Sequence, residues 1–171
     1  MKEIFEVANE FVKVAKLKDK INVGRTATND ELKTLRSKFG TLIPEWFYSL
    51  IKEVPLLKLE VLNQQFEPEE DYDGLLHIQL AEPAHIIDEG YDAYPGFLIR
   101  EKGYVCIGLD LVGSGDQIFI DFNDSNYPVY QIYHDAGDTA EELLKHGREL
   151  ISPLFKEFLQ EGIKLLNNKS K

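Results

Sequence analysis

The chain has 171 residues, of which 43% are hydrophobic and 29% are charged, and its net charge at pH 7 is −11. This composition is that of an ordinary globular protein, and it excludes collagen-like and intrinsically disordered chains. No run of residues approaches the roughly 20 apolar residues of a membrane span, and the charged N-terminus lacks the apolar segment of a signal peptide. Cys106 is the only cysteine, so no internal disulfide can form, and we expect a cytoplasmic protein. The length fits a single domain over residues 1–171.

Apolar residues at helical spacing predict three helices in the first third of the chain. The first covers residues 3–17. A capping box that begins at Thr28 starts the second helix, which ends at Gly40. Pro44 begins the third helix, which ends before Pro55.

Runs of β-branched and aromatic residues predict the strands. The expected strands cover residues 57–62, 75–80, 96–100, 104–109, 116–122 and 129–133. Ile118, Ile120 and Phe122 alternate with Phe119, so the strand that contains them is expected to be covered on both faces. The glycines of the Gly113–Ser114–Gly115 run predict a tight reversal before it.

The remaining segments complete an α+β pattern. Residues 63–74 are polar and acidic and are expected to form a loop, and residues 82–94 a turn or a short helix. Residues 139–144 are helix-prone, and the Ser152–Pro153 pair begins a helix over residues 154–166. Because helices precede and follow the strands, we expect an α+β fold with a central, mostly antiparallel sheet.

The acidic residues are concentrated in the middle of the chain. Between Leu59 and Leu144 there are 19 Asp and Glu residues, whereas only Arg100 and Lys102 are basic, which gives a net charge of −17. Phosphate binding requires the opposite sign, so we expect no nucleic-acid partner. The negative field favours a basic protein partner, and simple solubility is the alternative explanation.

Acidic side chains and tyrosines in polar segments are the candidate partner-binding residues, since a tyrosine supplies both area and a hydroxyl group to an interface. They are Glu69, Glu70, Asp71, Tyr72, Asp73, Asp92, Tyr94, Asp116, Asp124 and Tyr127. Loop packing is the alternative role for the tyrosines. Trp46, the only tryptophan, is expected to be a core anchor or a binding hot spot.

No motif in the sequence predicts catalysis, a cofactor or a metal site. The glycines near Ser114 lack both the third glycine of a dinucleotide fingerprint and the lysine of a phosphate loop. Asp116 and Asp121 are separated by an odd number of residues, so in one strand they face opposite sides and do not share a metal ion.

His134 and Asp135 leave one chemical alternative open. This pair resembles the dyad of metal-dependent phosphohydrolases, and His77 and His85 are the upstream histidines that could complete such a site. The other interpretation is a hydrogen-bonded structural pair at the end of a strand.

Three stretches occur in an order that is typical of one family. They are FGTLIPEWFYSLI (39–51), GYVCIGLDLVGSGDQIFID (103–121) and PVYQIYHD (128–135). Together they resemble the SUKH superfamily, which includes a fungal regulator of cell-wall synthesis and many bacterial immunity proteins that neutralise polymorphic toxins. The resemblance covers residues 37–160, and residues 1–36 form an N-terminal helical extension to it. One departure is the Glu53–Val54–Pro55 run, where family members commonly have Asn-Gly.

The resemblance implies a SUKH-like α+β fold without enzymatic activity or cofactor, which acts by binding another protein. The positions that match the recurring motif residues are expected to be structural or partner-facing. They are Pro44, Trp46, Gly108, Gly113, Gly115, Asp116 and Asp121. Our first hypothesis is therefore an immunity protein whose acidic surface covers a basic toxin, such as a nuclease. The alternatives are a metal-dependent hydrolase that uses His134 and Asp135, and a regulatory scaffold in cell-envelope control.

Overall fold

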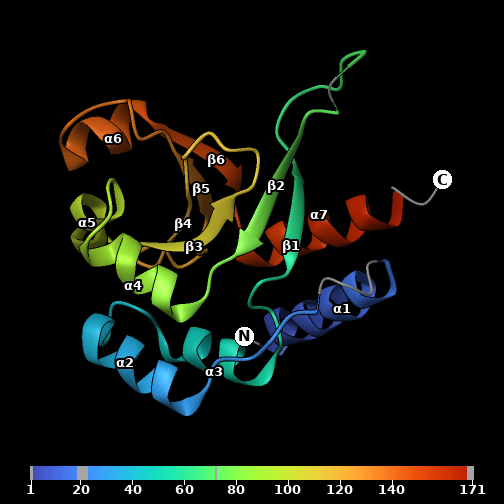
Figure 1. Cartoon of the computed structure of the whole chain (residues 1–171), viewed down its shortest axis with the longest axis horizontal. Helices are drawn as coiled ribbons and strands as arrows, with labels where there is room; N and C mark the ends of the chain where they lie inside the picture. The colour runs from blue at the N-terminus through green and yellow to red at the C-terminus, as the bar shows by residue number, and fades with distance from the viewer. Residues whose placement is uncertain (1, 19–22, 72, 169–171) are drawn as a thin grey trace.

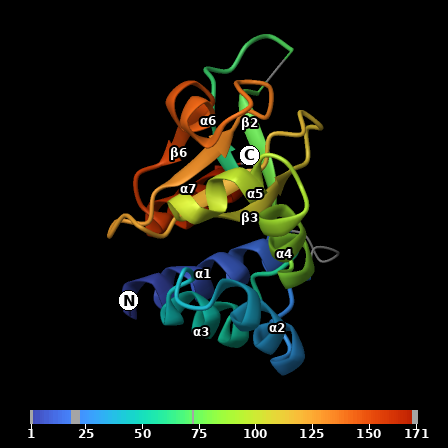
Figure 2. The same cartoon turned by 90° about the vertical axis from the view of Figure 1, so that its left-hand side faces the viewer.

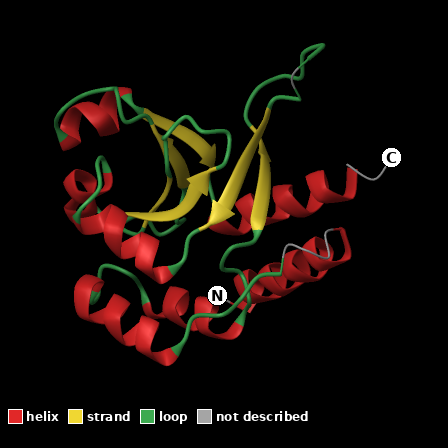
Figure 3. Ribbon diagram, viewed as in Figure 1, coloured by secondary structure: helices red, strands yellow, loops and turns green. Residues whose placement is uncertain are grey.

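The computed structural model describes residues 2–18, 23–71 and 73–168. It is the expected α+β fold, with helices before, beside and after one sheet (Figure 1 and Figure 3). The described α-helices are α1 (Lys2–Lys18), α2 (Asn29–Phe39), α3 (Glu45–Glu53), α4 (Pro83–Tyr91), α5 (Gly96–Ile99), α6 (Ala140–His146) and α7 (Phe155–Asn168). The described strands are β1 (Glu60–Gln64), β2 (Leu75–Leu80), β3 (Tyr104–Asp110), β4 (Ile118–Asp121), β5 (Val129–Ile132) and β6 (Arg148–Ser152).

The strands lie in the sheet in the same order as in the chain, β1-β2-β3-β4-β5-β6. Every neighbouring pair is antiparallel, which confirms the predicted meander and extends it to six strands. β1 and β6 are the two edges, since β1 pairs only with β2 and β6 only with β5.

A hydrophobic cluster covers each face of the sheet. The larger cluster joins Ile118, Ile120 and Phe122 to residues of α1, α3 and α7. The smaller cluster joins Phe119 and Cys106 to residues of α5 and α6. The expected alternation along the β4 segment is therefore confirmed, because adjacent side chains of a strand point to opposite faces.

The N-terminal helices share the larger cluster with the sheet. Phe11 of α1 and Phe158 of α7 are both completely buried. Gly162 of α7 is needed at this contact, since a Cβ atom there would lie 3.2 Å from Phe11 Cε2 and 2.9 Å from Val61 Cγ1. Figure 2 shows α1, α2 and α3 together beneath the sheet. Residues 2–18 and 23–36 are thus part of the same packed body as the strands.

The capping signal at Thr28 is confirmed in atomic detail. Thr28 Oγ1 accepts a hydrogen bond from the backbone N–H of Glu31 at 3.2 Å, and Glu31 Oε2 accepts one from the Thr28 N–H at 2.8 Å. Thr139 and Glu142 form a second capping box, which begins α6. Both pairs satisfy backbone donors that a helix N-terminus otherwise leaves without partners.

The strand expected at residues 96–100 is wrong, because this segment forms α5 followed by a 3-10 turn over Arg100–Lys102. The Phe97 N–H donates to Ala93 O at 3.1 Å, and Ile99 is completely buried in the smaller cluster. A four-residue apolar run has too little periodicity to separate a buried strand from a turn of helix, so tertiary packing decides.

Two further boundaries differ from the expectation. β1 is shifted toward the C-terminus because Leu57 pairs with Arg25 instead, through backbone hydrogen bonds of 3.0 and 3.1 Å. β6 has no counterpart in the sequence prediction. Its side chains are mostly half-buried or exposed, with Leu150 53% exposed, so it lacks the apolar signal of an inner strand.

Candidate protein-binding surface

Two loops meet at one end of the sheet around a cleft of about 210 Å³. One joins β1 to β2 and extends away from the body of the molecule at the top of Figure 1. The other joins β3 to β4. The lining residues are Gln65, Phe66, Leu76, Asp110, Val112, Ser114, Asp116, Gln131 and Tyr133. We call residues 65–71, 73, 74 and 111–117 the acidic rim.

Asp110 shapes the β3–β4 half of the acidic rim. Its carboxylate accepts hydrogen bonds from the backbone N–H groups of Val112 and Ser114, both at 2.9 Å, and from Ser114 Oγ at 2.6 Å. Gly113 and Gly115 have φ values of +91° and +84°, which side chains disfavour. The connection is therefore a wide, internally bonded loop, and the tight reversal expected here is wrong.

Asp116 lies at the base of the acidic rim and is buried. Its Oδ1 accepts from the backbone N–H of His134 at 2.9 Å and lies 2.7 Å from His134 Nδ1. The expected structural histidine–aspartate pair is present, but the partner is Asp116; the adjacent Asp135 is exposed. Because the Asp116 carboxylate is already hydrogen-bonded to His134, we do not expect it to bond a partner directly. Its contribution as a candidate partner-binding residue is the negative potential that it adds beneath the acidic rim.

A polar network closes the cleft toward the edges of the sheet. Gln65 Nε2 donates to Gln131 Oε1 at 2.7 Å and to Glu149 Oε2 at 3.3 Å. The hydroxyl group of Tyr133 donates to the same Glu149 carboxylate. Gln131, which is 3% exposed, donates to Asp116 O at 3.2 Å. These bonds tie the end of β1 to β5 and β6.

The outer surface of the acidic rim combines exposed apolar side chains with carboxylates. Phe66, Leu111 and Val112 are 50%, 48% and 61% exposed. Glu67, Glu69, Glu70, Asp71 and Asp73 are exposed in the same β1–β2 loop as Phe66. The acidic rim contains no lysine or arginine. A surface that combines exposed apolar side chains with charge of one sign is typical of binding to a partner of the opposite charge.

The other candidate partner-binding residues lie away from the acidic rim. Asp92 and Tyr94 follow α4, and the Tyr94 hydroxyl group donates to Gly137 O. Asp124 is exposed in the β4–β5 turn, where the Tyr127 ring packs 5.0 Å from that of Trp46. Tyr72 lies outside the described residues. The structure therefore distributes the predicted set over three places and brings only the loop residues together with Asp116.

Sequence reasoning missed the apolar part of the surface. Phe66 stands alone in a polar segment, and Leu111 and Val112 form a short apolar pair before the glycines of the next loop. Apolar residues in such loops are the signal that could have identified this surface. Gln65 and Glu149 could be placed only from the strand register, since they are far apart in the sequence.

Four of the motif positions lie at structural points of the fold. Gly108 lies at a bulge in β3, where a Cβ atom would come within 2.5 Å of Ile78 Cγ2. Asp121 ends β4 and accepts from the Asn123 N–H at 2.9 Å. Pro44 is the N-cap residue of α3. Trp46 is buried among aromatic rings.

Three of the histidines lie beside a carboxylate, each in a different place. His77 contacts Glu60, His134 contacts Asp116, and His85 Nε2 lies 3.8 Å from Glu89 Oε1. Within the described part of the chain, no three His, Cys, Asp or Glu side chains form a group that could hold a metal ion. The convergence that the hydrolase alternative requires is therefore not seen among these residues.

Glu89 of α4 gives the fold a predicted pH dependence. Its side chain is 6% exposed, and burial, reinforced by nearby Asp88, raises its pKa from 4.5 to about 7. As the pH rises, the folded state therefore retains the Glu89 proton longer than the unfolded state does. The contribution of protonated Glu89 to the free energy of unfolding is complete below pH 4.5 and is lost as the pH rises to about 7. We expect Glu89→Gln to be about 2–3 kcal/mol more stable than the wild type at pH 8 and similar to it at pH 4.

Urea unfolding of both proteins at pH 4, 5.5 and 8 measures this difference. Burial lowers the pKa of His85, whose titration opposes that of Glu89 with rising pH. Because His85 is present in both proteins, the difference between them reports the titration of Glu89 together with its contact to His85. Asp92→Asn, which removes an exposed carboxylate, is the control and is expected to follow the wild type. A constant difference between Glu89→Gln and the wild type across this range would contradict the prediction.

Among the described residues, no helix combines the length and the apolarity that crossing a membrane requires. Comparison of the chain with protein-family models, curated proteins and solved structures found no match.

Proposed function

We propose that the chain is a protein-binding module that recognises a basic protein through the acidic rim. The observation that supports this most directly is the composition of that surface. The two loops expose three apolar side chains, each about half exposed or more, together with several carboxylates, and neither loop contains a basic residue. Apolar contacts supply affinity, and the surrounding charge accelerates the approach of a cationic partner and selects against acidic proteins.

The proposal extends to an immunity protein whose partner is a basic toxin. It rests on the resemblance of residues 37–160 to the SUKH superfamily and on the sign of the charge in the middle of the chain. It includes a cytoplasmic location, because the one cysteine, Cys106, is buried and has no second cysteine with which to pair. No cofactor is required for this role.

Capture from the native host tests the proposal. The purified chain is immobilised, and proteins retained at about 50 mM salt and released at about 500 mM are identified by mass spectrometry. The association rate of the identified partner with the chain is then measured across the same range. We expect a basic partner whose association rate falls by at least about tenfold at high salt, since screening removes electrostatic steering.

Two results would contradict the proposal: an acidic partner, and an association rate that is independent of salt. The immunity role adds a measurement in cells. Expression of the captured partner alone is expected to arrest growth, and co-expression of the chain is expected to restore it. A partner that is harmless when expressed alone would refute the immunity role while leaving the binding function intact.

A further inference from the structure

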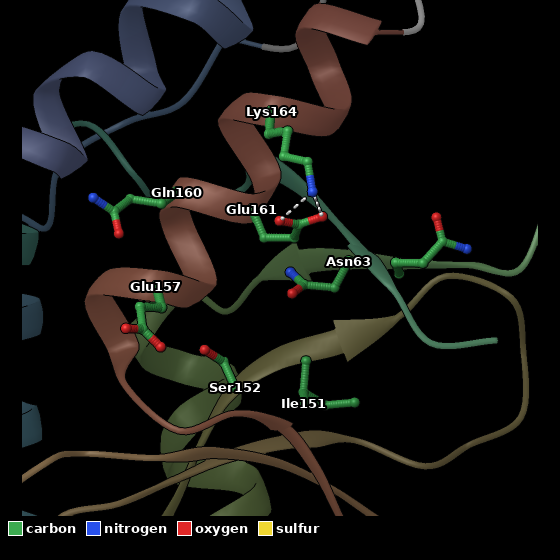
Figure 4. Close-up of a pocket in the computed structure, with 8 residues that line it drawn as sticks. Asn63, Ile151, Ser152, Glu157, Gln160, Glu161 and Lys164 are labelled. Atoms are coloured by element: carbon green, nitrogen blue, oxygen red, sulfur yellow. Dashed lines mark hydrogen bonds and ion pairs between the residues drawn. The ribbon is translucent and has the colours of Figure 1, made fainter. Parts of the chain in front are cut away.

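A second, larger cleft of about 500 Å³ lies between the two edge strands and α7. Its lining residues are Asn63 and Gln64 of β1, Ile151 and Ser152 of β6, and Glu157, Gln160, Glu161 and Lys164 of α7. Figure 4 shows the Asn63 side chain between α7 and the Ile151 and Ser152 residues of β6. The volume is within the range of sites that bind ligands.

The strands on the two sides of this cleft do not pair with each other. Over residues 2–18, 23–71 and 73–168, no backbone hydrogen bond joins β1 to β6. Side chains connect the two edges at the end of β1, where Gln65 reaches Glu149. Of the two edge strands, β6 is the open one, since Arg148 and Leu150 are exposed, whereas Val61, Leu62 and Asn63 of β1 are buried. The N–H and C=O groups of β6 that do not face β5 are therefore the ones that an added strand could bond.

Asn63 supplies an independent indication of a ligand. The residue is 3% exposed, and its Nδ2 atom has no hydrogen-bond partner among the described residues. Leaving a buried amide N–H without an acceptor costs about 1–3 kcal/mol, so native proteins usually satisfy it. A backbone carbonyl group of a polypeptide in the cleft would provide that acceptor.

The charges of α7 indicate which polypeptide fits. Lys164 Nζ bonds Glu161 through distances of 3.1 and 3.2 Å and so neutralises it. Glu157 is exposed and makes no hydrogen bond or ion pair with any described residue. Lys156, whose charge interacts with that of Glu157, makes its hydrogen bond to Glu3 instead, so the Glu157 carboxylate can still bond a further cation.

We propose that the cleft between β1 and β6 binds an extended segment of the partner protein as an added strand. The segment bonds an exposed strand edge, accepts from Asn63 Nδ2, and places a lysine or arginine side chain against Glu157. This deepens the proposed function and rests on it, because it assigns the partner an extended basic segment in addition to the surface that meets the acidic rim. Strand addition of this kind takes its affinity from main-chain hydrogen bonds and its specificity from side-chain contacts.

Peptide titration of the full chain, followed by amide NMR, tests the inference. The probe is an acetylated, amidated hexapeptide of alternating lysine and valine, and the control peptide has glutamate in place of lysine. The lysine peptide is expected to shift the backbone signals of Gln64, Ile151 and Ser152 and the side-chain amide of Asn63. The glutamate peptide is expected to bind at least about fivefold more weakly, since it meets Glu157 with like charge.

Two variants separate the contacts. Glu157→Gln is expected to lower the affinity for the lysine peptide by about threefold at low salt. Glu10→Gln, at an exposed position of α1, is expected to leave this affinity unchanged. Asn63→Leu keeps the number and the branching of the side-chain heavy atoms and removes the amide. This variant is expected to raise or maintain the denaturation midpoint and to lower the affinity for the lysine peptide by at least about fivefold.

The inference is overturned if the lysine peptide causes no shifts in the cleft, shifts the acidic rim instead, binds no better than the glutamate peptide, or binds Asn63→Leu with unchanged affinity. These outcomes are distinct from failure of the proposed function. A partner whose binding depends on the acidic rim but not on Glu157 or Asn63 would refute the added strand alone. Cleft binding of the lysine peptide without any captured basic protein would refute the proposed function alone.

Discussion

Replacement of Glu70 and Asp71 by lysine is expected to slow association of the partner protein with the chain by about tenfold at low salt. Both side chains are exposed in the turn of the β1–β2 connection, so their replacement leaves the fold intact. The change reverses the charge at the part of the acidic rim that a basic partner meets first. The effect is expected in the association rate and to disappear at about 500 mM salt, because steering is screened there.

A matched variant controls for net charge. Glu10→Lys combined with Glu53→Lys changes the net charge by the same amount, but on exposed positions of α1 and α3. This control is expected to change the association rate by less than about threefold. Equal slowing by the two double variants would show that total charge matters and position does not. In that case the acidic rim has no special role, and the solubility explanation of the charge is the better one.

The parts of the fold that the sequence predicts best are those with a local physical cause. The capping box at Thr28 depends on two side chains three residues apart, and the structure contains both of its hydrogen bonds. The alternation of Phe119 with Ile118 and Ile120 depends only on the two-residue period of a strand. By contrast, the α5 segment has the residue types of a strand and folds as a helix because its neighbours bury it.

The candidate site was less predictable because its residues meet through strand register. His134 follows β5 and Asp116 precedes β4, and these strands pair in antiparallel fashion. The end of one strand therefore lies beside the start of the other, and Ile132 N–H donates to Gln117 O at 3.1 Å. The sequence does not show directly that β4 pairs with β5. For this reason the sequence alone favoured the adjacent Asp135 as the partner of His134.

The same limit explains the scattered partner-binding residues. Acidic residues and tyrosines were selected by local composition, which is similar in the β1–β2 loop, the segment after α4 and the β4–β5 turn. Only the first of these has exposed apolar side chains from a second loop beside it. Composition can therefore indicate that a binding surface is acidic. That Phe66 and Val112 line the same cleft can be known only from the order of the strands.

Trp46→Ala is expected to destabilise the fold by about 3–5 kcal/mol, which would lower the melting temperature by roughly 10 °C or more. The Trp46 ring lies within 5.0–6.0 Å of the rings of Phe47, Phe122, Tyr127 and Phe155, measured between centroids. It thereby joins α3 to the end of β4, to the β4–β5 turn and to α7. Truncation to alanine would leave a cavity where four segments meet, and the surrounding rings cannot all move inward to fill it.

Trp46→Phe is the matched variant, and its expected cost is only about 1–2 kcal/mol. The indole Nε1 atom is buried and has no hydrogen-bond partner among the described residues, so phenylalanine loses ring volume but no hydrogen bond. Because Trp46 is the only tryptophan, unfolding must be followed by circular dichroism in urea. Val112→Ala, at a position that is 61% exposed, is expected to stay within about 0.5 kcal/mol of the wild type while it weakens partner binding. A Trp46→Ala protein as stable as Val112→Ala would show that the aromatic cluster does not hold these segments together, and the position of the β4–β5 turn would then need another cause.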